Sequence, residues 1–235
     1  MKKQLLTFGL LLLSSVLFAQ VSAKEKQALI DFYLATNGEN WVNTWDLNTP
    51  VDQWHGITVK ENKVTAISML FNNVEGSLPN SIGSLENLKI LELPFNKLSG
   101  EIPNSIGNLK NLEILVFNGN SLTGSIPSTI GNMESLKKIH LSSNILSGEV
   151  PVEISNLTEL ELLNVFDNNL TGTLPMGLAQ SKNLKKLVVA ENELITTQAF
   201  SSLLLFLDDA NLEFSNSLTP SAKTVIAIET SEDEN

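Results

Sequence analysis

Two histidines are the side chains of this sequence best suited to acid–base chemistry, because imidazole titrates near neutral pH. They are His55, in an aromatic segment, and His140, in the middle of a repetitive region. Under the 24-residue repeat set out below, Val116 and Asn164 flank His140 on neighbouring strands. Glu92 then lies two strands away, at roughly 10 Å, which is beyond hydrogen-bond reach. No serine nucleophile with an orienting carboxylate is expected beside the ring.

Other signatures of catalysis and metal binding do not occur. The sequence has no His-Glu-x-x-His run, no phosphate-binding loop and no calcium-binding loop. It also has no cysteine, which excludes thiolate nucleophiles and thiolate metal sites. We therefore predict that the chain is not an enzyme, with no catalytic residue, no metal and no cofactor.

The charge of the chain argues against nucleic acid as a partner. The formal net charge is −11, and all 15 basic residues are lysine. Removal of Lys2 and Lys3 with an N-terminal signal would leave about −13. An acidic surface repels phosphate backbones, and without arginine the bidentate fork that reads phosphate or guanine is missing. We predict no nucleic-acid partner.

Asparagine recurs at one fixed interval through the middle of the chain, every 24 residues. The members of this asparagine ladder are Asn72, Asn96, Asn120, Asn144, Asn168 and Asn192. Apolar residues keep fixed offsets from each of them; around Asn96 they are Leu88, Leu91, Leu93 and Leu98. A repeat of this length is the signature of stacked coils that bury one continuous core.

Each position of the repeat has a physical role. The apolar-x-apolar pair before each asparagine predicts a short strand with one buried face, and stacked copies form a parallel sheet. The asparagine amide is predicted to bond backbone groups of its own and the neighbouring coil, as a structural ladder with no binding role. The glycines that follow suit a turn with positive φ, and the later prolines follow an extended residue.

Residues 64–195 resemble the plant-type class of leucine-rich repeat, LxxLxLxxNxLxGxIPxxIGxLxx. The copy from Leu88 to Leu109 reads LKILELPFNKLSGEIPNSIGNL. The resemblance implies a solenoid of about six coils, shaped as a right-handed arc with the parallel β-sheet on its concave face. It also implies a second short extended segment near each Gly-x-[Ile/Leu/Val]-Pro.

The residues before the repeats predict a signal and then a cap. Lys2 and Lys3 precede an uncharged apolar run, which indicates a secretory signal peptide over 1–23, cleaved after Ala19 or Ala23. The run is too short to span a bilayer, so we expect no membrane insertion and a secreted or periplasmic protein. Residues 24–63 are predicted to form a helical N-terminal cap, with Gly38 after its helix as a stop.

Two motifs carry a resemblance of this segment to the N-terminal caps of receptor-like and bacterial repeat proteins. They are Ala28-Leu29-Ile30-Asp31-Phe32 and Trp54-His55-Gly56-Ile57. Asp52 and Val59 stand where many plant members have disulfide-bonded cysteines, and Ala35-Thr36-Asn37-Gly38 is more similar to the bacterial, secreted versions. Trp41, Trp45 and Trp54 could form an aromatic platform, but we favour a plug for the open end of the first coil.

The repeat pattern fades after Asn192. We expect a C-terminal cap over residues 196–228 and an acidic tail over residues 229–235.

The repeat register identifies the side chains that face outward from the concave sheet. Apolar residues gather on its first three coils, which favours an interaction surface there. Alternatively, Phe71 and Phe95 fold back beside the ladder and pack locally. The candidate ligand-binding residues are Leu70, Phe71, Ile90, Glu92, Phe95, Ile114, Val116, Asn118, His140, Asn164 and Phe166.

These observations favour an exported, non-catalytic binding module that recognises a protein or peptide ligand through its concave face. One alternative is glycan or cell-wall binding, or inhibition of a wall-degrading enzyme. Another is a structural surface or adhesion protein.

Overall fold

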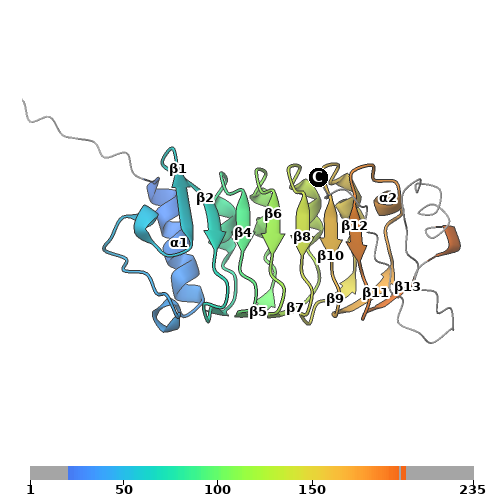
Figure 1. Ribbon diagram of the computed structural model, residues 1–235, viewed down its shortest axis with the longest axis horizontal. Coiled ribbons are helices and arrows are strands. Elements are labelled where there is room, and N and C mark those ends of the chain that lie inside the picture. The colour runs from blue at the N-terminus through green and yellow to red at the C-terminus, as the bar shows by residue number, and fades with distance from the viewer. Residues whose placement is uncertain (1–20, 196, 200–235) are drawn as a thin grey trace, which may run out of the picture.

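A row of similar coils forms most of the molecule, as the computed structural model shows for residues 21–195 and 197–199 (Figure 1). Each coil contributes one strand to a seven-stranded sheet, which runs in the order β1-β2-β4-β6-β8-β10-β12. The strands are β1 Ile57–Lys60, β2 Lys63–Ser68, β4 Ile90–Glu92, β6 Ile114–Val116, β8 Lys138–His140, β10 Leu162–Asn164 and β12 Lys186–Val188. The predicted solenoid of parallel strands is confirmed.

The register of this sheet follows the sequence repeat. From β2 onward neighbouring strands are parallel, and residues 24 positions apart are partners, as for Val116 with His140 and His140 with Asn164. Only β1 is antiparallel: it forms a hairpin with β2 that has an irregularity between Thr58 and Val59. Outward side chains therefore stand in columns that cross the coils about 4.8 Å apart.

The second extended segment of each coil forms two smaller parallel sheets, β3-β5-β7 and β9-β11-β13. These strands are β3 Glu75–Gly76, β5 Lys97–Glu101, β7 Ser121–Thr123, β9 Ser147–Glu149, β11 Asn169–Thr173 and β13 Glu193–Ile195. A glycine at positive φ turns the chain in most coils, for example Gly100 at +72°. These strands confirm the second extended segment that the resemblance implied.

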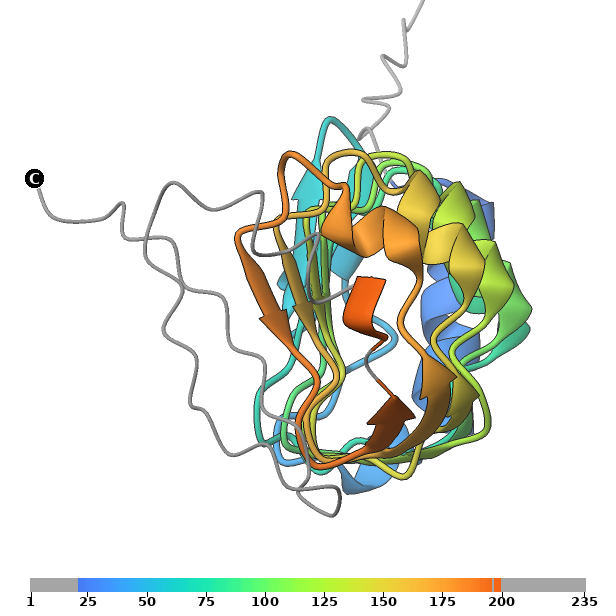
Figure 2. The ribbon, with the colours of Figure 1, turned by 90° about the vertical axis from the view of Figure 1, so that its right-hand side faces the viewer.

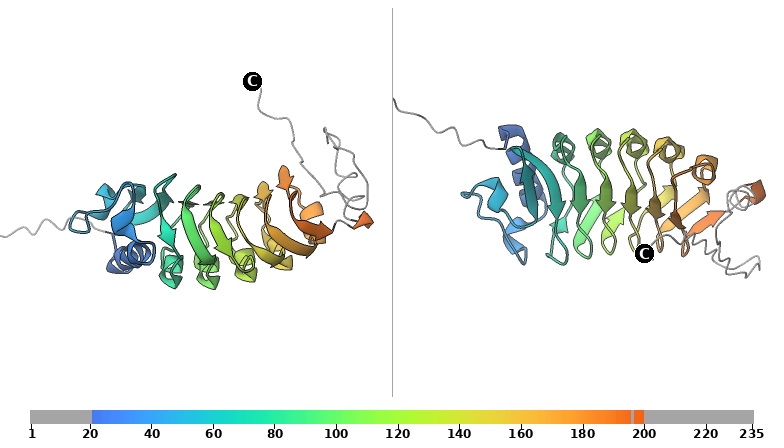
Figure 3. Two further views of the ribbon diagram at one scale, coloured as in Figure 1. Left: turned by 90° about the horizontal axis from the view of Figure 1, so that it is seen from below. Right: turned by 45° about the horizontal axis from the view of Figure 1, so that its top comes forward.

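Short helices cover the side of each coil opposite the large sheet (Figures 2 and 3). They are η3 Asn80–Ser84, η4 Asn104–Asn108, η5 Ser128–Asn132, η6 Val152–Asn156 and α2 Met176–Ala179. A proline precedes each of them as the N-cap residue. Gly107 lets η4 approach η5 closely, because a Cβ there would lie 2.3 Å from the Thr129 carbonyl oxygen.

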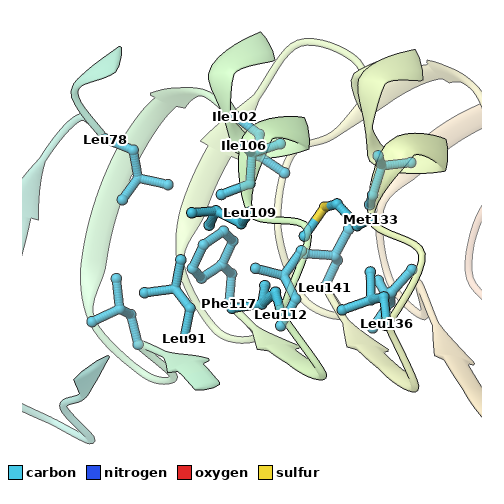
Figure 4. Close-up of a cluster of buried hydrophobic side chains, with 14 of the residues drawn as sticks. Leu78, Leu91, Ile102, Ile106, Leu109, Leu112, Phe117, Met133, Leu136 and Leu141 are labelled. Carbon is cyan, nitrogen blue, oxygen red and sulfur yellow. The ribbon is translucent and has the colours of Figure 1, made fainter. Parts of the chain in front are cut away.

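The inward side chains of all coils form one continuous apolar core. Figure 4 shows a part of it, where Leu91, Ile106 and Phe117 come from different elements and point into the same interior. Leu91, Leu115, Ile139, Leu163 and Leu187 occupy the same position in successive strands, and each is fully buried. No single coil could bury this face alone, so stacking is what stabilises the strands.

The asparagine ladder links the coils through backbone groups. Asn96 Oδ1 accepts hydrogen bonds from the N–H groups of Asn72 and Val74, at 2.9 and 3.1 Å. Its Nδ2 donates to the carbonyls of Met69 and Pro94, at 2.7 and 3.1 Å. The amides of Asn120, Asn144, Asn168 and Asn192 likewise bond both their own and the preceding coil. Asn72 and Asn168 are buried, whereas the other four are half-buried.

The N-terminal segment lies against the first coil. Helix α1, Ala23–Ala35, places Leu29 and Phe32 in the core. The helix ends before Gly38, as expected: Thr36 is its C-cap, and Gly38 begins the short helix η1, Gly38–Asn40. Asn43 takes the place of a preceding coil, because its N–H donates to Asn72 Oδ1 at 2.7 Å.

Three tryptophans fill the space between this helix, the helix η2, Val51–Gln53, and the hairpin. Trp41, Trp45 and Trp54 are all buried, and Trp45 stacks on Trp54 with ring centroids 4.8 Å apart. Each indole N–H donates to a backbone carbonyl. Their burial excludes an exposed aromatic platform and confirms that they plug the end of the core. Residues 1–20 of the signal peptide expected over 1–23, most of the expected C-terminal cap and the whole of the expected acidic tail lie outside the described residues.

Candidate functional site

The concave sheet carries an aromatic pair on its first two coils. Phe71 and Phe95 stack with ring centroids 4.9 Å apart and an angle of 17° between the ring planes. They remain 63% and 48% exposed, and Leu70 beside them is also exposed. The two rings therefore pack against each other, in agreement with the expectation of local packing. They nevertheless keep a large apolar surface toward solvent.

Both phenylalanines have a left-handed backbone, with φ of 50° and 52°. The same column holds Gly119 (φ 67°), Ser143, Asp167 and Glu191, all at positive φ. Bulky side chains are rare in this conformation, which costs roughly 1–2 kcal/mol for a residue with a Cβ. The backbone thus does not favour phenylalanine at these two positions, and their exposed rings do not fill the core.

Aliphatic side chains also face outward from the strands of the first three coils. Ile90, Ile114 and Val116 are partly exposed on β4 and β6, and strand pairing places Ile90 opposite Ile114. Glu92 is the acidic group beside them, and its Oε2 accepts a hydrogen bond from Ser68 Oγ at 3.1 Å. The first three coils therefore bring together most of the predicted site residues on one mainly apolar surface.

His140 lies in a polar network on the fourth and fifth coils. Its Nε2 is 3.0 Å from Ser142 Oγ and 2.9 Å from Asn164 Nδ2. Asn164 Oδ1 accepts from the N–H of Phe166 at 3.0 Å, so its Nδ2 donates to the ring. Burial lowers the pKa of His140, which favours the neutral ring that accepts these bonds.

Ser142 was not expected beside His140. It stands two residues after His140, and side chains two residues apart on a strand share a face. This spacing could have predicted that the two side chains are neighbours. This pair nevertheless lacks the features of a nucleophilic site. Nε2 faces Asn164 as well as Ser142, and no carboxylate bonds the ring within the part of the chain that the structure describes.

A row of alternating charges borders the sheet where its strands begin. Lys89 and Lys137 both contact Glu113, at 3.3 and 3.0 Å, and Lys185 contacts Glu161 at 3.7 Å. Hydrogen bonds from Lys137 and then Lys89 lower the pKa of Glu113. These exposed pairs neutralise one another, so they do not form an anion site.

A separate groove of about 560 Å³ lies beside the N-terminal segment. Val21, Lys26, Asp52 and Val59 are among its lining residues. None of the predicted site residues borders it. The candidate site is instead an open surface, which suits a macromolecular ligand better than a small molecule held in a cavity.

Two classes of site have no candidate among residues 21–195 and 197–199. These residues contain no group of three or more His, Cys, Asp or Glu side chains able to hold a metal ion. They also contain no helix of the length and apolarity that a membrane crossing requires.

Comparison with known proteins gives matches in the repeat region. Residues 87–109, 111–133 and 135–157 match the Leucine Rich Repeat family model. A probable leucine-rich repeat receptor-like protein kinase of Arabidopsis thaliana is 34% identical over 91 residues, which are 39% of this chain. The chain spans 13% of the length of that relative.

Solved structures with the same fold include plant receptor ectodomains. The ectodomain of the Arabidopsis thaliana receptor kinase GASSHO1/SCHENGEN3, in complex with CASPARIAN STRIP INTEGRITY FACTOR 2, has a TM-score of 0.69 at 28% identity, and the match covers 72% of this chain and 21% of that one. The PEPR1–AtPEP1 structure has a TM-score of 0.65 at 27% identity, covering 72% and 25%. The BIR3–SERK2 complex, also from Arabidopsis thaliana, has a TM-score of 0.60 at 28% identity, covering 73% and 95%.

Proposed function

Because this chain is a leucine-rich-repeat protein of the plant-type class, we propose that it is a non-catalytic module that binds a protein or peptide ligand. The ligand lies on the first three coils of the concave sheet. The observation that carries this proposal is the exposed Phe71–Phe95 stack.

The exposed surface of the stack supports a binding role. A stacked aromatic pair contributes about 0.5–1.5 kcal/mol beyond its buried area, which roughly offsets the backbone cost of one of the two residues. The positive φ recurs at this position in the other coils, so it belongs to the repeat and not to this pair alone. The Phe95 ring also covers Gly119, where a Cβ would lie 2.6 Å from the ring. What distinguishes the pair is its exposed apolar surface, because such surface is typical of interaction sites.

Similar proteins support the ligand class. The structure of the GASSHO1/SCHENGEN3 ectodomain contains CASPARIAN STRIP INTEGRITY FACTOR 2, and another structure is that of PEPR1–AtPEP1. This chain matches less than a third of each of those ectodomains, so their ligands do not identify the ligand of this chain. What the chain shares with them is a curved parallel sheet suited to an extended polypeptide.

We propose that the protein is exported, as the apolar segment before Val21 indicates. Cleavage after Ala19 suits the fold better than cleavage after Ala23. Ser22 is the N-cap of α1, and its Oγ accepts a hydrogen bond from the N–H of Glu25 at 3.2 Å. Cleavage after Ala23 would remove this cap.

The test is selection of ligands by the mature protein from a random dodecapeptide phage library, in parallel with a glycan array. We expect the selection to recover peptides. Phe95→Ala should weaken their binding at least tenfold, since truncation of an anchoring aromatic typically costs more than about 1.4 kcal/mol. Val152→Ala is the control, because Val152 is an apolar side chain exposed on η6, on the opposite side of the coils.

Two results would contradict the proposal. One is peptide binding that Phe95→Ala and Phe71→Ala leave unchanged. The other is a signal confined to the glycan array, which would favour the glycan alternative.

A further inference from the structure

The hydrogen bonds around His140 fix the protonation state of its ring. Nε2 lies 2.9 Å from Asn164 Nδ2 and 3.0 Å from Ser142 Oγ. The orientation of the Asn164 carboxamide is set by its other end, because Oδ1 accepts from the N–H of Phe166 at 3.0 Å. An amide nitrogen can only donate, so Nε2 must be the unprotonated nitrogen of a neutral ring that carries its proton on Nδ1.

A proton on Nε2 is incompatible with this network. It would place two donors, Nε2–H and Nδ2–H of Asn164, against each other at 2.9 Å. The bond to Ser142 survives protonation, because a hydroxyl can reverse its direction and accept from Nε2–H. Asn164 has no such choice. Its carboxamide either turns Nδ2 away from the ring or rotates to offer Oδ1, and rotation gives up the bond from Phe166.

The backbone around Phe166 does not depend on this carboxamide. The carbonyl of Phe166 accepts from the N–H of Ser143 at 2.9 Å, and Asp167 and Val165 donate their N–H groups to the next coil. Loss of an Asn164 bond therefore leaves the stack of coils intact. The change is confined to one carboxamide and to the N–H of Phe166, a residue whose side chain is 37% exposed on the concave sheet.

The neighbouring strands bring no charge against the ring. The outward residues of β6 and β10 that flank β8 are Ile114, Val116, Leu162 and Asn164. Glu113 and Glu161 precede these two strands and are paired with lysines. The other charged groups of the outward face are Lys138 on β8, Glu92 on β4, Lys186 on β12 and Asp167 after β10. Burial is what lowers the pKa of His140, so the ring gains its proton only below about pH 6.5.

We propose that this network is an acid-sensitive switch on the fourth and fifth coils, in which protonation of His140 releases the Asn164 carboxamide and leaves a cationic ring beside it. Above the transition the surface here is neutral and its polar groups are bonded to one another. Below the transition it carries a positive charge and an amide that can bond other groups. An exported protein meets the pH of its surroundings, and histidine is the side chain that responds in this range.

Nuclear magnetic resonance of the isotope-labelled mature protein, titrated from about pH 7.5 to about pH 4.5, tests the switch without any ligand. We expect the ring of His140, the side-chain amide of Asn164 and the backbone N–H of Phe166 to change with one shared midpoint. His140→Gln should remove this transition from the signals of Asn164 and Phe166. His55→Gln is the matched control, because His55 is the other histidine of the chain and lies exposed in the N-terminal segment.

Substitution of Asn164 separates the switch from a merely structural role. Asn164→Ala removes a bond that only the neutral ring can accept, so the pKa of His140 should rise and the response of Phe166 should disappear. Asn164→Asp places a carboxylate where it can accept from Nε2–H, so the pKa should rise further. Asp167→Asn removes the carboxylate next to Phe166 in the chain, and the three groups should keep a shared midpoint.

Several results would overturn the inference. One is an Asn164 amide whose signals stay constant while His140 titrates. Others are a transition that persists in His140→Gln and a pKa of His140 that Asn164→Ala leaves unchanged or lowers. Loss of signal dispersion throughout the protein at the same midpoint would show unfolding in place of a local switch. None of these results bears on the proposed binding surface, which depends on Phe71 and Phe95 of the first two coils.

Discussion

The asparagine ladder allows a quantitative prediction, because its members do not share their bonds equally. Asn120 accepts from the N–H of Leu98 and donates to the carbonyls of Leu93 and Phe117, each at 2.9 Å. In Asn120→Ala, the Phe117 carbonyl keeps its second donor, Asn144 Nδ2 at 3.0 Å. The groups of Leu98 and Leu93 lose the asparagine bonds. At about 1–2 kcal/mol for each buried group left unpaired, Asn120→Ala should cost about 2–4 kcal/mol.

Asn144→Ala provides the comparison within the same ladder. Its removal leaves the N–H of Leu122 unpaired, whereas the carbonyls of Phe117 and Leu141 keep bonds from Asn120 and Asn168. The expected cost is therefore about 1–2 kcal/mol, half of that for Asn120→Ala.

Urea unfolding followed by circular dichroism measures both costs, with unchanged m-values as the sign that the same surface unfolds. Asn111→Ala is the control, because its single side-chain bond, to the Glu86 carbonyl, is exposed. Equal losses of unfolding free energy for Asn120→Ala and Asn144→Ala would refute the explanation that shared carbonyls make the second substitution less costly. Losses no larger than that of the control would refute the structural role of the ladder.

Three further predictions concern titration, backbone and processing. Burial lowers the pKa of His140 below its unfolded value of about 6.5, so the neutral ring contributes stability that is present above about pH 6.5 and lost as the pH falls through the folded-state pKa. Urea unfolding of His140→Gln across this range should lack that part of the pH dependence. Gly148→Ala should cost about 1–2 kcal/mol because φ is +78°, and Gly107→Ala should cost more because its Cβ would lie 2.3 Å from a backbone oxygen of the next coil. The order of their urea midpoints tests this. The mass of the exported protein should place cleavage after Ala19, and a mass that lacks Ser22 would contradict the role of this residue as helix cap.

Most of the fold could be predicted from the repeat register. Because each coil repeats one pattern, the position of Leu91 or Leu115 relative to its asparagine was enough to predict which face is buried. The N-terminal segment was harder, since it does not repeat. Its helix was predicted, but the contact of Asn43 with Asn72 depends on a loop that no periodicity describes.

The candidate site was predictable as a set of columns and not as a set of contacts. Register alone placed Asn118 and Phe166 outward, and strand pairing agrees with the expected neighbours of His140. The burial of Asn118 and the bond between His140 and Ser142 depend on side-chain rotamers and on the height of the neighbouring side chains. The pattern of columns in the sequence gives no information on rotamers or on the height of neighbouring side chains.

The most direct test of the binding surface is the affinity of a library-selected peptide for a variant with both Ile90→Lys and Val116→Lys, measured by isothermal titration calorimetry. Both side chains are partly exposed on the sheet, so lysine can be accommodated there without entering the core. A control with Asn156→Lys carries a new charge on η6. The account predicts a loss of more than about tenfold for the double variant and no change for the control, because a desolvated unpaired charge is costly at an interface. Equal affinities of the wild type and a double variant with an unchanged unfolding curve would contradict binding at this surface.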